Sequence, residues 1–174
     1  MDRVTLQFNN DNTVATVALN RPEKHNGVDW PMLKAVRTVQ LKLAKHKTLR
    51  AVILKGEGPS FCAGLDVKSV MSNPKTAVVM YANLWLPMRN IFQTWSMGWR
   101  DLGVPVIAQI HGNCFGAGIQ LAMGADIRVC TPDSQLSILE AKWGLVPDMG
   151  GAALVRELLP VDVAKELTMT GRIL

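Results

Sequence analysis

Two short and almost wholly apolar segments constrain the fold of this chain more than any other feature. They are "RAVILKG" at residues 50–56 and "VPVIAQI" at residues 104–110. A strand with apolar residues on both faces is typical of a parallel sheet packed between helices. Because parallel strands need long crossover connections, helices are expected between them. The pattern therefore predicts an α/β fold.

The remaining hydrophobic pattern agrees with this fold class. Strands are expected over residues 4–8, 13–19 and 125–129, where β-branched and apolar residues are bounded by turn-forming residues. Apolar residues at helical spacing predict a helix with one buried face within residues 32–47, namely Met32, Leu33, Val36, Val39 and Leu43. We interpret Trp85, Trp95 and Trp99, in the segment 75–101, as core or subunit contacts.

Size and composition narrow the class of protein. A chain of 174 residues with 48% hydrophobic content is long enough for one domain with its own core, so a single domain over residues 1–174 is expected. The sequence shows neither a leader peptide nor an apolar run long enough to span a membrane. Its three cysteines lack metal-ligand spacing. We expect a cytoplasmic protein without a metal site or a disulfide framework.

The net charge of +5 is concentrated near the N-terminus, where residues 1–55 hold ten Lys or Arg against four acidic residues. Lys34, Arg37, Lys42 and Lys45 fall outside the apolar stripe of the predicted helix. A solvated helix face is the simplest interpretation. Attraction of a phosphate-bearing ligand or of RNA remains an alternative.

Two loops rich in small residues follow the two apolar strands. They are "FCAGLD" at residues 61–66 and "GNCFGAG" at residues 112–118. Ligands collect at the carboxyl edge of parallel sheets, and amides in the first turn of a helix lack intrahelical acceptors. If the amides of Ala63 and Ala117 converge, they form an oxyanion hole for a carbonyl oxygen that gains negative charge.

Four blocks resemble the enoyl-CoA hydratase/isomerase (crotonase) superfamily in their order and separation. These are "NRPEKHNGVD", "FCAGLDVK", "HGNCFGAGIQLAMGADIRV" and "SILEAKWGLVPDMGG". The resemblance implies a crotonase-like spiral of repeated ββα units, a homotrimer or hexamer, and an acyl-CoA thioester as substrate, with no permanently bound cofactor. It also implies that family members continue beyond the last residue here, so that this chain resembles a truncated member.

The resemblance also assigns site residues. The two oxyanion amides correspond to Ala63 and Ala117. The coenzyme A (CoA) moiety is expected along the segments that contain Lys24, His25, Gly27, Ala63, Gly64, Leu65, Asp66, Val67 and Gly116.

The expected acid/base groups depart from the hydratase pattern. Hydratases of this superfamily use two glutamates, and the corresponding residues here are Gln120 and Glu140. A glutamine cannot exchange a proton at neutral pH, although it can orient a water molecule. Glu140 is therefore the expected acid/base group, and hydration with Gln120 orienting the water is an alternative.

Asp148 supplies a second carboxylate, eight residues after Glu140. A carboxylate here resembles the dienoyl-CoA isomerase branch, which favours double-bond isomerisation of an enoyl- or dienoyl-CoA. A turn residue after Pro147 is the structural alternative for Asp148.

Other polar residues are interpreted as structural. Asp66 is expected to cap a helix, Cys62 and Cys114 to pack, and His111 to form a structural hydrogen bond. The rival from another functional class is a non-catalytic or RNA-binding protein that uses the basic helix, although nucleic acid is the less favoured partner and no membrane partner is expected.

Overall fold

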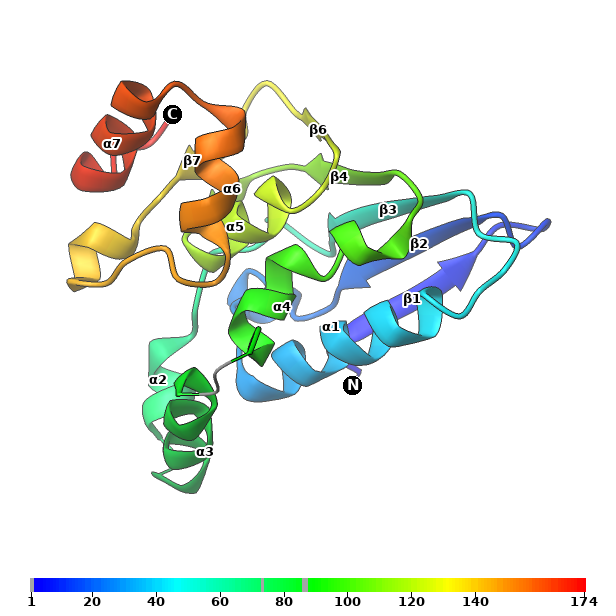
Figure 1. Ribbon diagram of the computed structural model, residues 1–174, viewed down its shortest axis with the longest axis horizontal. Coiled ribbons are helices and arrows are strands. Elements are labelled where there is room, and N and C mark those ends of the chain that lie inside the picture. The colour runs from blue at the N-terminus through cyan, green and yellow to red at the C-terminus, as the bar shows by residue number, and fades with distance from the viewer. Residues whose placement is uncertain (1, 73, 86–87) are drawn as a thin grey trace.

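The computed structural model describes residues 2–72, 74–85 and 88–174, and its order of elements is that of an α/β fold (Figure 1). The strands are β1 (Val4–Phe8), β2 (Val14–Leu19), β3 (Ala51–Gly56), β4 (Val106–Ile110), β5 (Asn113–Phe115), β6 (Ile127–Cys130) and β7 (Gln135–Ser137). The α-helices are α1 (Trp30–Leu43), α2 (Val67–Met71), α3 (Pro74–Leu84), α4 (Ile91–Met97), α5 (Ala117–Met123), α6 (Gly151–Leu158) and α7 (Val161–Thr170). The short 3-10 helices are η1 (Pro22–Lys24), η2 (Arg100–Leu102) and η3 (Glu140–Trp143).

The main sheet has the order β1-β2-β3-β4-β6 within the described residues. Strands β1 and β2 form an antiparallel pair, and β2, β3, β4 and β6 run parallel. Strands β5 and β7 form a small parallel sheet. The predicted α/β class and parallel crossovers are thus confirmed.

One face of the main sheet forms the core. Val17, Leu54 and Ala108 lie side by side on β2, β3 and β4, and all three are fully buried. Helices α1 and α4 lie across this face (Figure 1). Trp95 and Trp99 are buried here, and the Trp95 indole donates to the Ala117 carbonyl at 2.8 Å, which ties α4 to the start of α5.

The prediction that the apolar strands are buried on both faces is wrong in part. Burial alternates along β3 and β4, so that Ile53 and Ile107 on the second face are only half-buried. Strand β6 is an edge strand, and its Ile127 and Val129 side chains are 52% and 55% exposed. The second face of the sheet is therefore apolar in composition, but the described residues cover it only in part.

The three tryptophans of the segment 75–101 differ in burial. The described part of this segment contributes to α3, α4 and η2, and Trp85 is 73% exposed rather than part of the core. Helices α2 and α3 lie away from the sheet (Figure 1), and most core residues of this segment lie on α4, with Met80 of α3 also buried in the core. A role of Trp85 in a subunit contact stays a prediction.

Helix α1 is confirmed with its buried stripe. Pro31 lies in its first turn, and the Asp29 side chain accepts a hydrogen bond from the Met32 amide as the N-cap. Lys34, Arg37, Lys42 and Lys45 all point to solvent, and none of them lines the cavity described below. The exposed positions agree with a solvated face.

Candidate active site

Two loops from the carboxyl edge of the sheet meet backbone to backbone. Gly64 and Gly116 both have positive φ, +101° and +51°, which favours glycine. A Cβ placed on Gly64 would lie 3.1 Å from the Phe115 carbonyl oxygen and 3.9 Å from the Ala117 amide nitrogen. The glycines thus allow the predicted convergence of the two loops.

The proposed donor Ala63 needs a correction. Its amide already donates to the His25 carbonyl at 2.9 Å, so it is not free to bind a ligand oxygen. Within the part of the chain that the structure describes, the amides of Leu65 and Ala117 donate to no protein acceptor. Since Leu65 and Ala117 both line the cavity, Leu65 replaces Ala63 as the candidate donor. The Ala63 assignment overlooked the hydrogen bond to His25, which the spacing of residues does not reveal.

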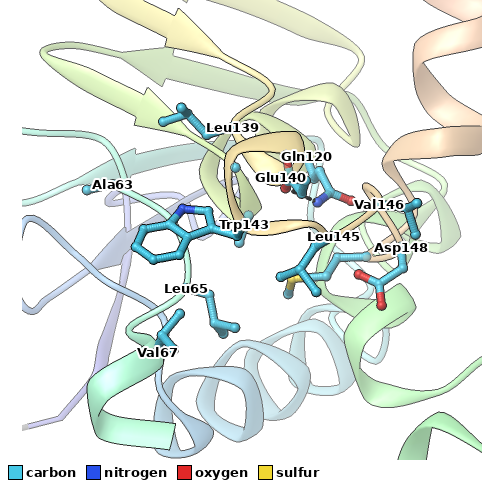
Figure 2. Close-up of a pocket in the computed structure, with 14 residues that line it drawn as sticks. Ala63, Leu65, Val67, Gln120, Leu139, Glu140, Trp143, Leu145, Val146 and Asp148 are labelled. Carbon is cyan, nitrogen blue, oxygen red and sulfur yellow. Dashed lines mark hydrogen bonds between the residues drawn. The ribbon is translucent and has the colours of Figure 1, made fainter. Parts of the chain in front are cut away.

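A cavity of about 220 Å³ lies where the loops meet (Figure 2). It is lined by Ala63, Gly64, Leu65, Val67, Gly116, Ala117, Gln120, Leu139, Glu140, Trp143, Leu145, Val146, Asp148 and Met149. A more open apolar cavity of about 640 Å³ shares Leu65, Asp148 and Met149 with it and extends to Tyr81 and Leu84 on α3. The apolar wall formed by Trp143, Leu145, Val146 and Met149 was not predicted, although all four lie in the block that contains Glu140 and Asp148.

Glu140 is a buried carboxyl group in the wall of this cavity, with only 8% of the residue exposed. Its Oε1 atom accepts a hydrogen bond from Gln120 Nε2 at 2.6 Å. Its Oε2 atom has no hydrogen-bond partner in the described part of the chain. Burial raises the pKa of Glu140, the hydrogen bond from Gln120 opposes this, and the negative charge of Asp148 adds to it.

Asp148 lines the same cavity and is exposed (Figure 2). Partial burial of its carboxyl group raises the pKa of Asp148, although the residue as a whole is exposed. Its amide donates to the Val146 carbonyl at 2.8 Å, which agrees with the alternative interpretation as a turn residue. The structure therefore brings Gln120, Glu140 and Asp148 to one cavity, in two different environments.

The segment expected to bind CoA forms a tight turn beside the first loop. His25 has a φ of 49°, and its ring Nδ1 lies 2.9 Å from Ser60 Oγ. Lys24 and His25 are exposed, whereas Gly27 is buried. The Asp66 carboxylate accepts from the Ser69 amide and pairs with Arg21 at 2.8 Å. Asp66 is thus the helix N-cap that the sequence predicted.

The other polar residues have structural contacts. Cys62 and Cys114 are buried beside each other on paired backbone segments, and burial raises the pKa of Cys62 to about 12. The His111 ring lies 2.8 Å from the Gly58 carbonyl. The packing role of the two cysteines and the structural role of His111 are confirmed.

Comparison with known proteins now identifies the family. A model of the enoyl-CoA hydratase/isomerase family matches residues 9–174. The chain belongs to this family. It is 31% identical over 169 residues to the carnitinyl-CoA dehydratase of Proteus mirabilis, covering 97% of this chain and 61% of the relative. The chain thus spans less than two thirds of the length of the curated relatives it matches.

Solved structures place the fold in the same family. A proposed enoyl-CoA hydratase from Streptomyces coelicolor aligns with a TM-score of 0.86 and 30% identity, over 99% of this chain and 61% of that one. One from Thermobifida fusca, solved in complex with CoA, aligns with a TM-score of 0.85 and 29% identity, over 99% of this chain and 66% of that one. The predicted crotonase-like fold is thereby confirmed.

None of the helices in residues 2–72, 74–85 and 88–174 is long and apolar enough to cross a membrane. In those same ranges, no three His, Cys, Asp or Glu side chains gather as a set of metal ligands.

Proposed function

We propose that this protein is an acyl-CoA enzyme that moves the double bond of an enoyl- or dienoyl-CoA through a thioester enolate. The observation that carries the proposal is that the buried Glu140 carboxyl lines the same cavity as Leu65 and Ala117, whose amides donate to no acceptor within the described residues. A base beside an oxyanion hole is the arrangement that stabilises charge on a carbonyl oxygen while a neighbouring carbon loses a proton.

The amides of Leu65 and Ala117 would bind the thioester oxygen. For a 3-enoyl-CoA, Glu140 removes a proton from C2, and the C–H electron pair moves into the conjugated enolate, whose charge rests on that oxygen. Return of the proton to C4 restores the thioester carbonyl and leaves the double bond between C2 and C3. Atoms and charges balance without any further reactant.

Glu140 or Asp148 would return the proton. A carboxyl group with a raised pKa is protonated more often near neutral pH, so it can act as an acid as well as a base. Burial raises the pKa of Glu140, and partial burial raises that of Asp148. The two groups thus suit a shuttle between two carbons of one substrate.

The CoA portion would lie along Lys24, His25, Gly27, the run from Ala63 to Val67, and Gly116. Lys24 and His25 are exposed beside the first loop, and the Leu65, Val67 and Gly116 positions line the cavity. The Thermobifida fusca relative was solved with CoA. We further propose that the protein assembles as a homotrimer or hexamer and acts in the cytoplasm.

Hydration or dehydration at the same carboxyl group is the second candidate, favoured by the relatives named carnitinyl-CoA dehydratase. Glu140 would then remove the proton from C2 of a 3-hydroxyacyl-CoA and return it to the departing hydroxyl group as water. One carboxyl group would perform both transfers.

A panel of substrates distinguishes the two reactions. Crotonyl-CoA, a 3-enoyl-CoA and a 3,5-dienoyl-CoA are incubated with the protein, and loss or migration of the conjugated double bond is followed by absorbance. Migration without addition of water supports isomerisation. Loss of the crotonyl-CoA double bond supports hydration, and no change with any substrate contradicts both.

A further inference from the structure

The side chain of Gln120 is held at both ends by protein groups. It is 1% exposed, its Oε1 accepts from the Gly151 amide at 2.9 Å, and its Nε2 donates to Glu140 Oε1 at 2.6 Å. Because a backbone N–H can only donate, the amide atom that faces Gly151 must be the oxygen. The nitrogen therefore faces Glu140.

This orientation makes the two oxygens of Glu140 unequal. An amide NH₂ can only donate, so Oε1 stays an acceptor whatever the charge of the carboxyl group. A proton on the Glu140 side chain then resides on Oε2, the oxygen without a protein partner. The Glu140 side chain thus has one defined proton-carrying atom, and this atom is buried.

The start of α6 is shaped to keep this arrangement. A Cβ on Gly151 would lie 2.6 Å from Gln120 Oε1 and 2.7 Å from its Cγ, so the glutamine packs directly on the glycine. The neighbouring Met149 carbonyl accepts a hydrogen bond from Ser96 Oγ, which ties this turn to α4. Helices α4, α5 and α6 together fix the Gln120 amide.

We propose that Gln120 is a positioning residue that holds Glu140 by Oε1, so that Oε2 alone carries the proton of this side chain. This assignment differs from a glutamine that orients attacking water. Gln120 already holds Glu140 Oε1 with one N–H and the Gly151 amide with its oxygen, and an amide group cannot take up the proton that an attacking water must lose. The inference rests on the proposed function for its substrate, and on the contacts alone for its geometry.

The titration of Glu140 depends on the charged groups that surround it. Among the described residues, the Asp148 carboxylate acts on Glu140. Lys142 lies exposed on the same η3 helix. Helix α7 packs against η3 and carries Asp162, Lys165 and Glu166 on exposed or half-buried positions. None of these residues changes in the variants below.

The test compares Gln120→Met with Gln40→Met. Gln40 is a matched control because it is also buried and donates to a backbone carbonyl, that of Thr94 at 3.1 Å, away from the cavity. We expect Gln120→Met to lower kcat by about tenfold to a hundredfold, the range of a lost hydrogen bond to a charged group, with KM unchanged. The acidic limb of the kcat profile shifts to higher pH, because the carboxylate loses a donor that stabilises it.

Gly151→Ala is a second variant that should break the hydrogen bond between Gln120 and Glu140. Its methyl group displaces the Gln120 amide without altering that residue, so we expect the same directions of change in kcat and pH profile. Gln40→Met should keep the wild-type profile. Wild-type kcat and pH profile in both Gln120→Met and Gly151→Ala, or an equal loss in Gln40→Met, would overturn the proposal.

A readout that needs no turnover separates this inference from the proposed function. Infrared difference spectra of the Glu140 carboxyl stretch are recorded during a pH titration, with Glu140→Gln used to assign the band. The proposal expects the titration of Glu140 to move to higher pH in Gln120→Met and to stay in place in Gln40→Met. An unchanged titration in Gln120→Met contradicts it, whichever reaction the substrate panel reveals.

Discussion

The two carboxyl groups of the cavity have opposite surroundings. Glu140 is buried and fixed through Gln120 to the backbone of α6, whereas Asp148 follows a turn and is exposed. A group fixed by packing and hydrogen bonds can be aimed at one atom of a substrate. Under the proposed function, Glu140 would carry the step that needs precise placement, and Asp148 would serve a step that tolerates approach from solvent.

The largest expected effect comes from removing the fixed carboxyl group. Glu140→Gln keeps the shape of the side chain but cannot exchange a proton, so turnover should fall by roughly 10²–10⁴-fold. Initial rates on the substrate of the panel that proves active measure the loss. Binding of CoA, followed by calorimetry, should be unchanged, and full activity in a folded variant would mean that Glu140 is not the acid/base group.

The proposed oxyanion hole gives the next effect. Ala117→Pro removes one amide hydrogen at the first position of α5, where proline is tolerated, and we expect kcat to fall by about 10²–10³-fold. Ala117→Gly keeps the amide at the same position and is the matched control. Equal kcat values for the two variants would show that this amide does not bind the reacting oxygen.

A smaller effect is expected at Asp148. Asp148→Asn keeps a residue suited to the turn but removes the carboxyl group that exchanges a proton. Because Glu140 can also return the proton, kcat should fall by about tenfold, which is less than the loss expected when a sole acid/base group is removed. Rates of isomerisation in single turnover measure this step. A loss as large as that of Glu140→Gln would erase the proposed difference between the two groups.

The smallest effect concerns stability. Burial raises the pKa of Glu140 above its value in the unfolded chain. Its contribution to stability is therefore present at pH values below the unfolded pKa and is lost as pH rises through the folded pKa. Glu140→Gln should then raise Tm at neutral pH relative to wild type, and by less in acid. Thermal unfolding at both pH values checks the sign, and a Tm gain confined to acid would contradict it.

Much of the fold followed from local patterns. Strands β1, β2, β3, β4 and β6 and the stripe of α1 depend on residues near each other in sequence, and they were predicted within a few residues of their observed bounds, whereas β5 and β7 were not predicted. The partly exposed second face of β3 and β4 was not predicted, because an apolar residue in a sequence gives no information about which element covers its side chain. The single domain over residues 1–174 stays a prediction.

The site was predictable in its side chains but not in its backbone. Gln120, Glu140 and Asp148 meet at one cavity as expected, since each comes from a recognisable block. The choice between the Ala63 and Leu65 amides depends on the His25 carbonyl, which is brought there by a turn with positive φ. The orientation of the Gln120 amide likewise depends on Gly151. Gly151 is distant from Gln120 in sequence, and no local pattern predicts the contact between them.

Exchange of substrate protons in deuterated water tests the central claim most directly. A 3-enoyl-CoA is incubated in D₂O with the wild type and with Glu140→Gln, and the position of the double bond and the deuterium content at C2 and C4 are followed by NMR. The account predicts a conjugated 2-enoyl product with deuterium incorporation for the wild type and neither change for Glu140→Gln. Exchange at the same rate in both proteins, or none with the wild type, would contradict enolate formation by Glu140.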